Sequence, residues 1–62
     1  MSIADILRSL REQSGLTLEE VGNKVGVSIQ SMYKYEHGRV TNIPSDKIAA
    51  LAKVYGVSPG YI

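Results

Sequence analysis

Residues 17–38 read TLEEVGNKVGVSIQSMYKYEHG, and this stretch decides the fold of the 62-residue chain. Thr17 and Glu20 have the spacing of a capping box, in which each side chain accepts a hydrogen bond from the backbone amide of the other residue. A helix is therefore predicted to begin at Leu18. It ends at Gly26, because glycine adopts a positive φ at little cost and commonly follows the last turn of a helix.

A second helix follows almost at once. Ser28 is a favourable N-cap, so we predict a helix over residues 29–37 that is ended by Gly38. Val27 fills the angle between the two helices. Gly22 lies inside the first helix, where glycine costs about 1 kcal/mol relative to alanine, and close approach of another helix would offset that cost. The stretch is therefore predicted to form two short helices joined by a tight turn.

The rest of the chain predicts further short helices around this pair. Ser2 caps a helix over residues 3–13, in which apolar residues recur at i, i+3, i+4 and i+7. A helix over about residues 45–55 repeats this pattern, and Pro59 stands at the first position of a short fifth helix. We predict an all-α fold, a compact bundle of four to five short helices in a single domain spanning residues 1–62.

Composition argues against several classes of protein. The chain has no cysteine and one histidine, so thiolate metal sites and Cys–His catalytic pairs are excluded, and no metal, cofactor or enzymatic activity is expected. The N-terminus lacks the basic and apolar regions of a signal peptide, and no apolar run approaches the ~20 residues of a membrane-spanning helix. We therefore expect a cytoplasmic protein with no membrane partner.

The net charge of +1 is low for a nucleic-acid-binding domain, but the charges are unevenly distributed. The middle of the chain has Lys24, Lys34 and Arg39 against the single acid Glu36. The second helix of the pair is polar on most of its surface, which is typical of a solvated connector or of a helix that reads a partner. An α-helix presented on a convex scaffold fits the major groove of B-DNA.

The pattern over residues 16–28, followed by Met32 and residues 35–38, resembles the helix-turn-helix of the Cro/CI family, also described as lambda-repressor-like. Residues 43–45 and 51–58 resemble the fourth helix of that family and the start of its fifth, so the resemblance covers essentially the whole chain. It implies that the opening stretch is the helix-turn-helix unit of the DNA-binding domain of a phage or bacterial transcriptional repressor. It also implies that the chain is the N-terminal part of a longer repressor.

The resemblance implies that the first, second and sixth residues of the second helix read DNA bases, and these are Ile29, Gln30 and Lys34. Gln30 has the groups to pair with adenine N6 and N7, and Lys34 can donate to guanine O6 or N7. Ile29 offers only apolar contact, to a thymine methyl group. Base recognition is thus expected to rest mainly on Gln30 and Lys34.

Contacts to the DNA backbone or to base edges are implied for a wider set of residues, namely Thr17, Ser28, Ser31, Tyr33, His37, Arg39, Thr41 and Asn42. Leu18 departs from the family, whose members commonly have a glutamine there that clamps a phosphate. Arg11 and Glu36 match a buried structural ion pair of the family. Glu36 is therefore assigned to the architecture rather than to the DNA.

The expected partner is double-stranded DNA with a two-fold operator, bound by a homodimer of the full-length protein. These residues alone are expected to be monomeric or weakly dimeric. Two alternatives remain open. One is a protein-interaction module on the same fold, which the low net charge, Leu18 and Ile29 favour slightly. The other is the antitoxin of a toxin–antitoxin pair, which would bind DNA and a protein together. Salt-dependent DNA binding and co-purification of a small partner distinguish them.

Overall fold

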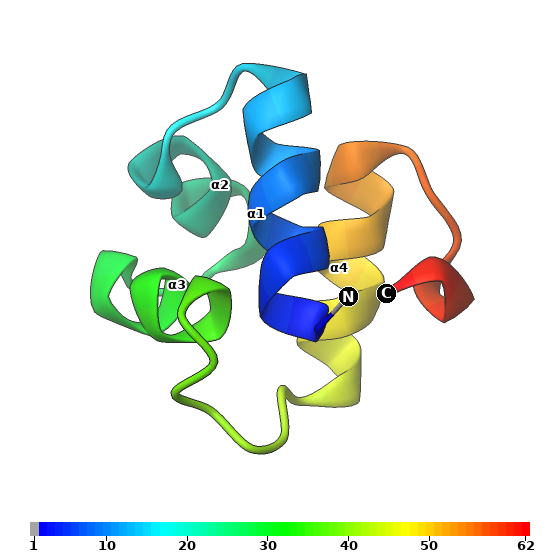
Figure 1. Ribbon diagram of the computed structural model, residues 1–62. Coiled ribbons are helices and arrows are strands. Elements are labelled where there is room, and N and C mark those ends of the chain that lie inside the picture. Colours follow the sequence, from blue (N-terminus) through cyan, green and yellow to red (C-terminus); the bar gives the residue numbers. More distant parts are fainter. Residues whose placement is uncertain (1) are drawn as a thin grey trace.

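Four α-helices surround one core in the computed structural model, which describes residues 2–62 (Figure 1). The elements are α1 (Ile3–Ser14), α2 (Leu18–Val25), α3 (Ile29–Glu36), α4 (Ser45–Tyr55) and a 3-10 helix, η1 (Pro59–Tyr61). All regular structure within the described residues is helical, so the all-α fold is confirmed.

Three of the predicted helices differ from the structure. α1 extends to Ser14, one residue beyond its predicted end. α3 ends at Glu36, because His37 leaves helical geometry with φ −114° and ψ 12°. The predicted fifth helix is only the three-residue turn η1. Gly60 lies in the middle of this turn, and glycine is a poor helix former because it loses more backbone freedom than other residues when it becomes ordered.

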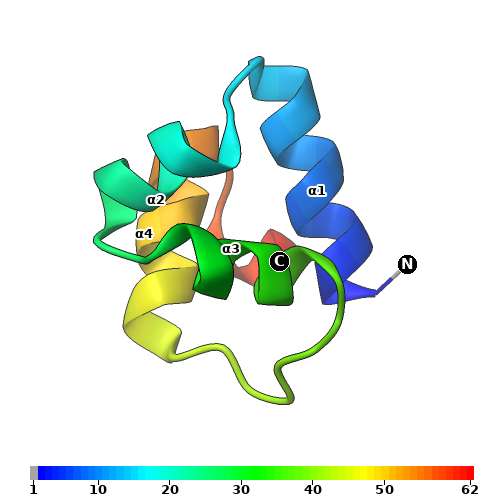
Figure 2. The same ribbon diagram turned by 90° about the vertical axis from the view of Figure 1, so that its left-hand side faces the viewer.

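Figures 1 and 2 show how the helices are arranged. In Figure 1, α2 and α3 lie on one side of α1 and α4 lies on the other. In Figure 2, α3 crosses the front of the molecule, with α2 above it and the loop to α4 below it. Among residues 2–62, no other helix covers the near side of α3 in this view. This side of α3 therefore faces solvent.

Each helix contributes one large, fully buried side chain to the core. These are Leu7 from α1, Val21 from α2, Met32 from α3 and Leu51 from α4. Burial of a side chain of this size contributes about 1.5–3 kcal/mol relative to leaving it in water. Met32 therefore anchors α3 to the bundle from the side opposite to its solvent-facing surface.

Both ends of α2 are satisfied by side chains. Thr17 Oγ1 accepts a hydrogen bond from the Glu20 amide at 3.1 Å, and the Glu20 carboxylate accepts one from the Thr17 amide at 3.0 Å, which confirms the capping box. The backbone hydrogen bond from Thr17 is the main cause that lowers the pKa of Glu20 below its ordinary value. At the other end, Lys47 Nζ on α4 donates to the Val25 carbonyl at 3.2 Å. A cation at a helix C-terminus also interacts favourably with the helix dipole.

The turn between α2 and α3 explains the glycine inside α2. Gly26 has the predicted positive φ, 73°, and the Val27 amide donates to the Gly22 carbonyl at 2.9 Å. A Cβ atom on Gly22 would lie 2.5 Å from the Val27 carbonyl oxygen and 3.5 Å from Met32 Cγ. α3 therefore approaches Gly22 through Met32, as expected, but the closest atom belongs to the backbone of the turn.

Within residues 2–62, no helix is both long and apolar enough to cross a membrane. The same part of the chain has no group of three or more His, Cys, Asp or Glu side chains arranged to hold a metal ion.

Candidate nucleic-acid interface

α3 is held at the surface of the bundle by one face and leaves the other face open. Met32 and Glu36, one helical turn apart, are buried with 0% and 3% of their surface exposed. Ile29 and Tyr33 lie along the edge of this buried side and are 47% and 44% exposed. Gln30 and Lys34 lie farther round the helix, away from the core, and are exposed. Ser28 caps the helix by accepting a hydrogen bond from the Ser31 amide at 3.1 Å. The short helix is thus fixed at its start and along its inner face.

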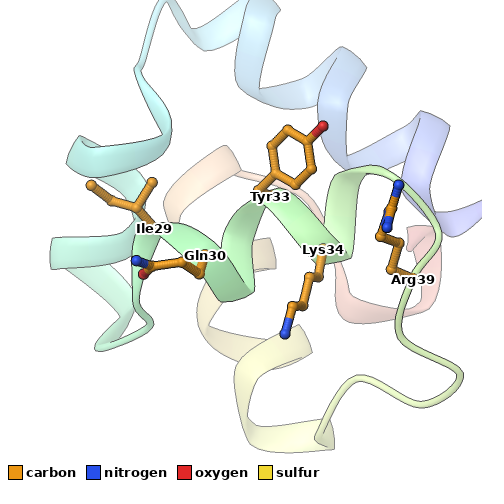
Figure 3. A pocket seen from close by; sticks show the side chains of 5 residues that line it. All are labelled: Ile29, Gln30, Tyr33, Lys34 and Arg39. Atoms are coloured by element: carbon orange, nitrogen blue, oxygen red, sulfur yellow. The ribbon is translucent and has the colours of Figure 1, made fainter.

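The exposed face of α3 forms an open hollow of about 440 Å³, lined by Ile29, Gln30, Tyr33, Lys34 and Arg39 (Figure 3). The structure therefore brings together the three residues assigned to base reading and two of those assigned to backbone or edge contacts. Figure 3 shows Ile29 and Tyr33 along the upper side of α3, Gln30 and Lys34 below them, and Arg39 beyond the end of the helix.

Arg39 reaches this hollow because the chain turns back on itself after α3. Gly38 has φ 68°, and the Arg39 amide donates to the Lys34 carbonyl at 3.0 Å. This bond joins residues five apart and is the main feature of a Schellman motif, which commonly ends helices at a glycine. The sequence contains the signal in Gly38, but helical spacing alone did not reveal that Arg39 would share a surface with the base-reading residues.

Tyr33 and His37 form a stacked pair beside the hollow. Their ring centroids are 3.8 Å apart and their planes differ by 16°. His37 Nδ1 lies 2.8 Å from the Tyr33 carbonyl oxygen. Because a carbonyl oxygen only accepts, Nδ1 must carry the proton in this contact. The imidazole is therefore fixed against the helix end, and it in turn supports one face of the Tyr33 ring.

A buried ion pair links α3 to α1. Arg11 Nε donates to Glu36 Oε2 at 2.8 Å, and Arg11 NH1 donates to the Leu16 carbonyl at 2.9 Å. The hydrogen bond to Glu36 is the main cause that raises the pKa of Arg11 above its ordinary value. This pairing also removes the only carboxylate of α3 from the surface, so the exposed charges of the helix and the following loop are Lys34 and Arg39.

Tyr55 on α4 lies near this ion pair. Its hydroxyl oxygen is buried and has no hydrogen-bond partner among the described residues. Burial first, and then the charge of Glu36, raise the pKa of Tyr55 to about 12, while Arg11 opposes the shift. The ring of Tyr55 packs against the buried cluster, but its polar atom has no hydrogen-bond partner there.

The other predicted contact residues lie outside the hollow. Thr17 is exposed but occupied in its capping box. Ser28 Oγ donates to Ser31 Oγ at 3.1 Å, so both hydroxyls take part in the cap of α3. Thr41 lines a separate hollow of about 210 Å³ near the start of α1. Asn42 is exposed in the loop before α4.

Leu18 occupies the position where the resemblance implies a phosphate-clamping glutamine in other members of the family. Its side chain is half-buried and packs against the hydrophobic core. Leu18 therefore stabilises the attachment of α2 to the bundle. It contributes no polar group towards solvent and adds little to an exposed apolar surface.

The geometry describes a short capped helix, a glycine turn and a second helix whose outer face is free, and the comparisons with known proteins identify the class. The family described as helix-turn-helix domain matches residues 2–60. The chain belongs to this family, which confirms the resemblance to Cro/CI-type helix-turn-helix proteins.

Among individual proteins, the chain is similar to the uncharacterized HTH-type transcriptional regulator YobD of Bacillus subtilis (strain 168), with 39% identity over 56 residues. The match covers 90% of this chain and 49% of YobD, so the chain spans about half the length of that relative.

Two solved structures share the fold. A structure described as the SinR protein/SinI protein complex gives a TM-score of 0.90 at 23% identity, over 97% of this chain and 58% of that chain. A crystal structure of SinR, the master regulator for biofilm formation, in complex with DNA gives a TM-score of 0.88 at 24% identity, over 95% of this chain and 94% of that chain.

Proposed function

We propose that this chain binds double-stranded DNA with the exposed face of α3 in the major groove, as the DNA-binding domain of a transcriptional regulator. The observation that carries the proposal is the hollow on α3, where Gln30, Lys34 and Arg39 meet on a face that the bundle leaves uncovered. The major groove of B-DNA is about 12 Å wide and admits an α-helix, so this face would lie against the edges of the bases.

Within this proposal the polar side chains contact different parts of the DNA. Gln30 pairs with adenine through N6 and N7, and Lys34 donates to guanine O6 or N7. Arg39, at the end of the helix, is suited to a phosphate at the edge of the groove. The amides of Leu18 and Glu19, which the capping box does not use, would add a weak anion site at the start of α2.

The local charge supports this proposal better than the net charge of +1 does. Glu36 is 3% exposed and paired with Arg11, so the surface of α3 and its following loop carries two cations and no exposed carboxylate up to Asn42. A phosphate backbone approaching this face therefore meets two positive side chains and no negative one, which favours association.

We further propose that the regulator is a repressor that binds a two-fold operator as a homodimer, with half-sites about one helical turn apart. The name of YobD as a transcriptional regulator and the description of SinR in complex with DNA support regulation through DNA. The chain spans about half of YobD, and we propose that a region beyond the matched half assembles the dimer.

Selection of binding sites from random duplex DNA tests the proposal, followed by anisotropy titrations of the selected site at several salt concentrations. Gln30→Ala and Lys34→Ala should each cost about 1–3 kcal/mol of binding free energy and relax the preference at one base position. Lys53→Ala is the charge-matched control, since Lys53 is exposed on α4 and does not line the hollow.

If no duplex is bound even at low salt, the proposal is wrong. Equal weakening by Lys34→Ala and Lys53→Ala on every sequence would also contradict it, because the loss would then follow charge alone.

One observation favours a second function on the same surface. Ile29 and Tyr33 are large apolar residues that lie exposed beside each other in the hollow, and such surfaces also bind proteins. SinR is described in a complex with SinI, so a protein of this fold does take a protein partner. A protein-interaction module would give binding that salt scarcely affects and that duplex DNA does not compete for.

A further inference from the structure

The exposed face of α3 is divided into two rows of different chemistry. Ile29 and Tyr33 are four residues apart and form an apolar row, 47% and 44% exposed. Gln30 and Lys34 are also four apart and form a polar row beside it (Figure 3). Residues at this spacing are neighbours on a helix, with Cβ atoms about 5–6 Å apart. Both rows line the same hollow, so a partner in the hollow meets both at once.

The apolar row is held in place before any partner arrives. The Tyr33 ring is stacked on His37 with centroids 3.8 Å apart, and His37 is itself bonded to the Tyr33 carbonyl at 2.8 Å. Ile29 is β-branched, which restricts its side chain to few rotamers. Little side-chain freedom remains to be lost when the row is covered, and this favours binding of small apolar groups.

We propose that the Ile29–Tyr33 row binds the C5-methyl groups of thymine bases, next to the purines that Gln30 and Lys34 read. The proposal rests on DNA binding by α3. Among the four base pairs, the thymine methyl is the one apolar group on the major-groove edge. The row spans about 5–6 Å and base pairs rise by about 3.4 Å, so its two members reach methyl groups on thymines one or two steps apart.

This assignment separates the ring of Tyr33 from its hydroxyl. A phosphate or base-edge contact would use the hydroxyl, whereas a methyl contact uses the ring. Tyr33→Phe keeps the ring and Tyr33→Ala removes it. The methyl assignment therefore expects affinity to be retained in Tyr33→Phe and reduced in Tyr33→Ala.

The experiment replaces thymine by deoxyuridine, one position at a time, in the site selected from random DNA. This change removes one methyl and leaves base pairing and phosphates unaltered. At one or two positions the affinity should fall about fourfold, the factor that corresponds to one buried methyl or methylene group. The salt dependence should not change, because the number of phosphate contacts is the same.

Variants of Ile29 and Tyr33 then test whether these residues contact the thymine methyl group. In Ile29→Ala or Tyr33→Ala, thymine and deoxyuridine should bind equally at the affected position. Gln30→Ala is the matched control, since it weakens binding but should retain the fourfold methyl effect. Thermal melting followed by circular dichroism verifies that each variant is folded at the assay temperature.

The possible failures are distinguishable. If the protein binds its selected site but deoxyuridine replaces thymine everywhere without effect, the methyl assignment is wrong and DNA binding stands. If Tyr33→Phe loses as much affinity as Tyr33→Ala, the hydroxyl makes the contact and the assignment of Tyr33 is wrong. If no duplex is bound at any salt concentration, both the proposed DNA binding and the methyl assignment are wrong.

Discussion

Replacement of Gly22 by alanine sets helix propensity against packing. Helix propensity alone predicts that the free energy of unfolding rises by about 1 kcal/mol, because alanine is the better helix former. The structure predicts the opposite sign, since the new Cβ would stand 2.5 Å from the Val27 carbonyl oxygen. That oxygen cannot move freely, because the Val27 amide is bonded to the Gly22 carbonyl at 2.9 Å and Gly26 fixes the turn with φ 73°.

Overpacking of this kind costs typically 1–3 kcal/mol, and a clash with backbone belongs at the upper end. Subtracting the propensity gain leaves Gly22→Ala less stable by about 2 kcal/mol. In a domain of this size, such a loss lowers the melting temperature by roughly 8–16 °C. Because the turn sets the position of α3, the variant should also bind DNA less tightly at temperatures near its melting point.

The assay is urea and thermal unfolding followed by circular dichroism. Asn23→Ala is the matched control, because Asn23 is the next residue of α2 and is exposed. In Asn23→Ala the free energy of unfolding should rise by a few tenths of a kcal/mol, because alanine has the higher helix propensity and the new side chain meets no clash. A Gly22→Ala protein as stable as the wild type, or more stable, would refute the packing argument and leave propensity as the dominant effect.

Three further predictions follow from the ion pair, the buried phenol and the hollow. Arg11→Met should lower the free energy of unfolding by about 3 kcal/mol, because it leaves Glu36, whose side chain is 1% exposed, without its partner. Glu36→Gln should cost less, since Arg11 is 18% exposed and keeps its bond to Leu16, and urea titrations that reverse this order would contradict the argument. The folded pKa of Tyr55, about 12, lies above its unfolded value of about 10, so its contribution to stability is complete below pH 10 and is lost as pH rises through 12. In Tyr55→Phe, the loss of stability at alkaline pH should disappear, together with the last step in the absorbance titration of the phenolates. The variant should be at least as stable as wild type at neutral pH, because the hydroxyl has no hydrogen-bond partner. Arg39→Ala should weaken binding to all sequences alike and reduce the salt slope by about 1, whereas a change in base preference at one position would make Arg39 a base reader.

The parts of the fold that depend on neighbouring residues could be predicted from the sequence. The capping box of Thr17 and Glu20 and the turn at Gly26 form with the expected geometry, because their hydrogen bonds and φ values are set within a few residues. The end of α3 was misplaced by one residue. Helix ends fray, and Gly38 marks the end of the helix only to within a residue, because His37 before it already leaves helical geometry.

Contacts between distant residues could not be predicted in the same way. The bond from Lys47 to the Val25 carbonyl joins α4 to α2, and no local pattern in either helix requires it. The stacking of Tyr33 on His37 has helical spacing, but its geometry depends on where His37 leaves the helix. The gathering of Arg39 with the α3 side chains likewise depends on the turn at Gly38. The candidate site was therefore predicted residue by residue, but its shape came only from the structure.

The low net charge of +1 affects how much of the proposed DNA affinity would come from contacts with phosphates. The hollow carries two exposed cations, Lys34 and Arg39. Even if both meet phosphates, a salt slope of about −2 is expected for one domain, at roughly −0.9 per phosphate. The sequence-independent attraction of these two cations is then small, so the proposed function relies on base contacts and on the proposed second domain of a homodimer for most of the affinity. Joining two domains makes the second binding event intramolecular and multiplies the affinity without new charge. The weakly charged face of α3 therefore suits the proposed homodimer. In such a dimer, sequence-specific contacts would contribute more to the affinity than the general attraction to phosphates.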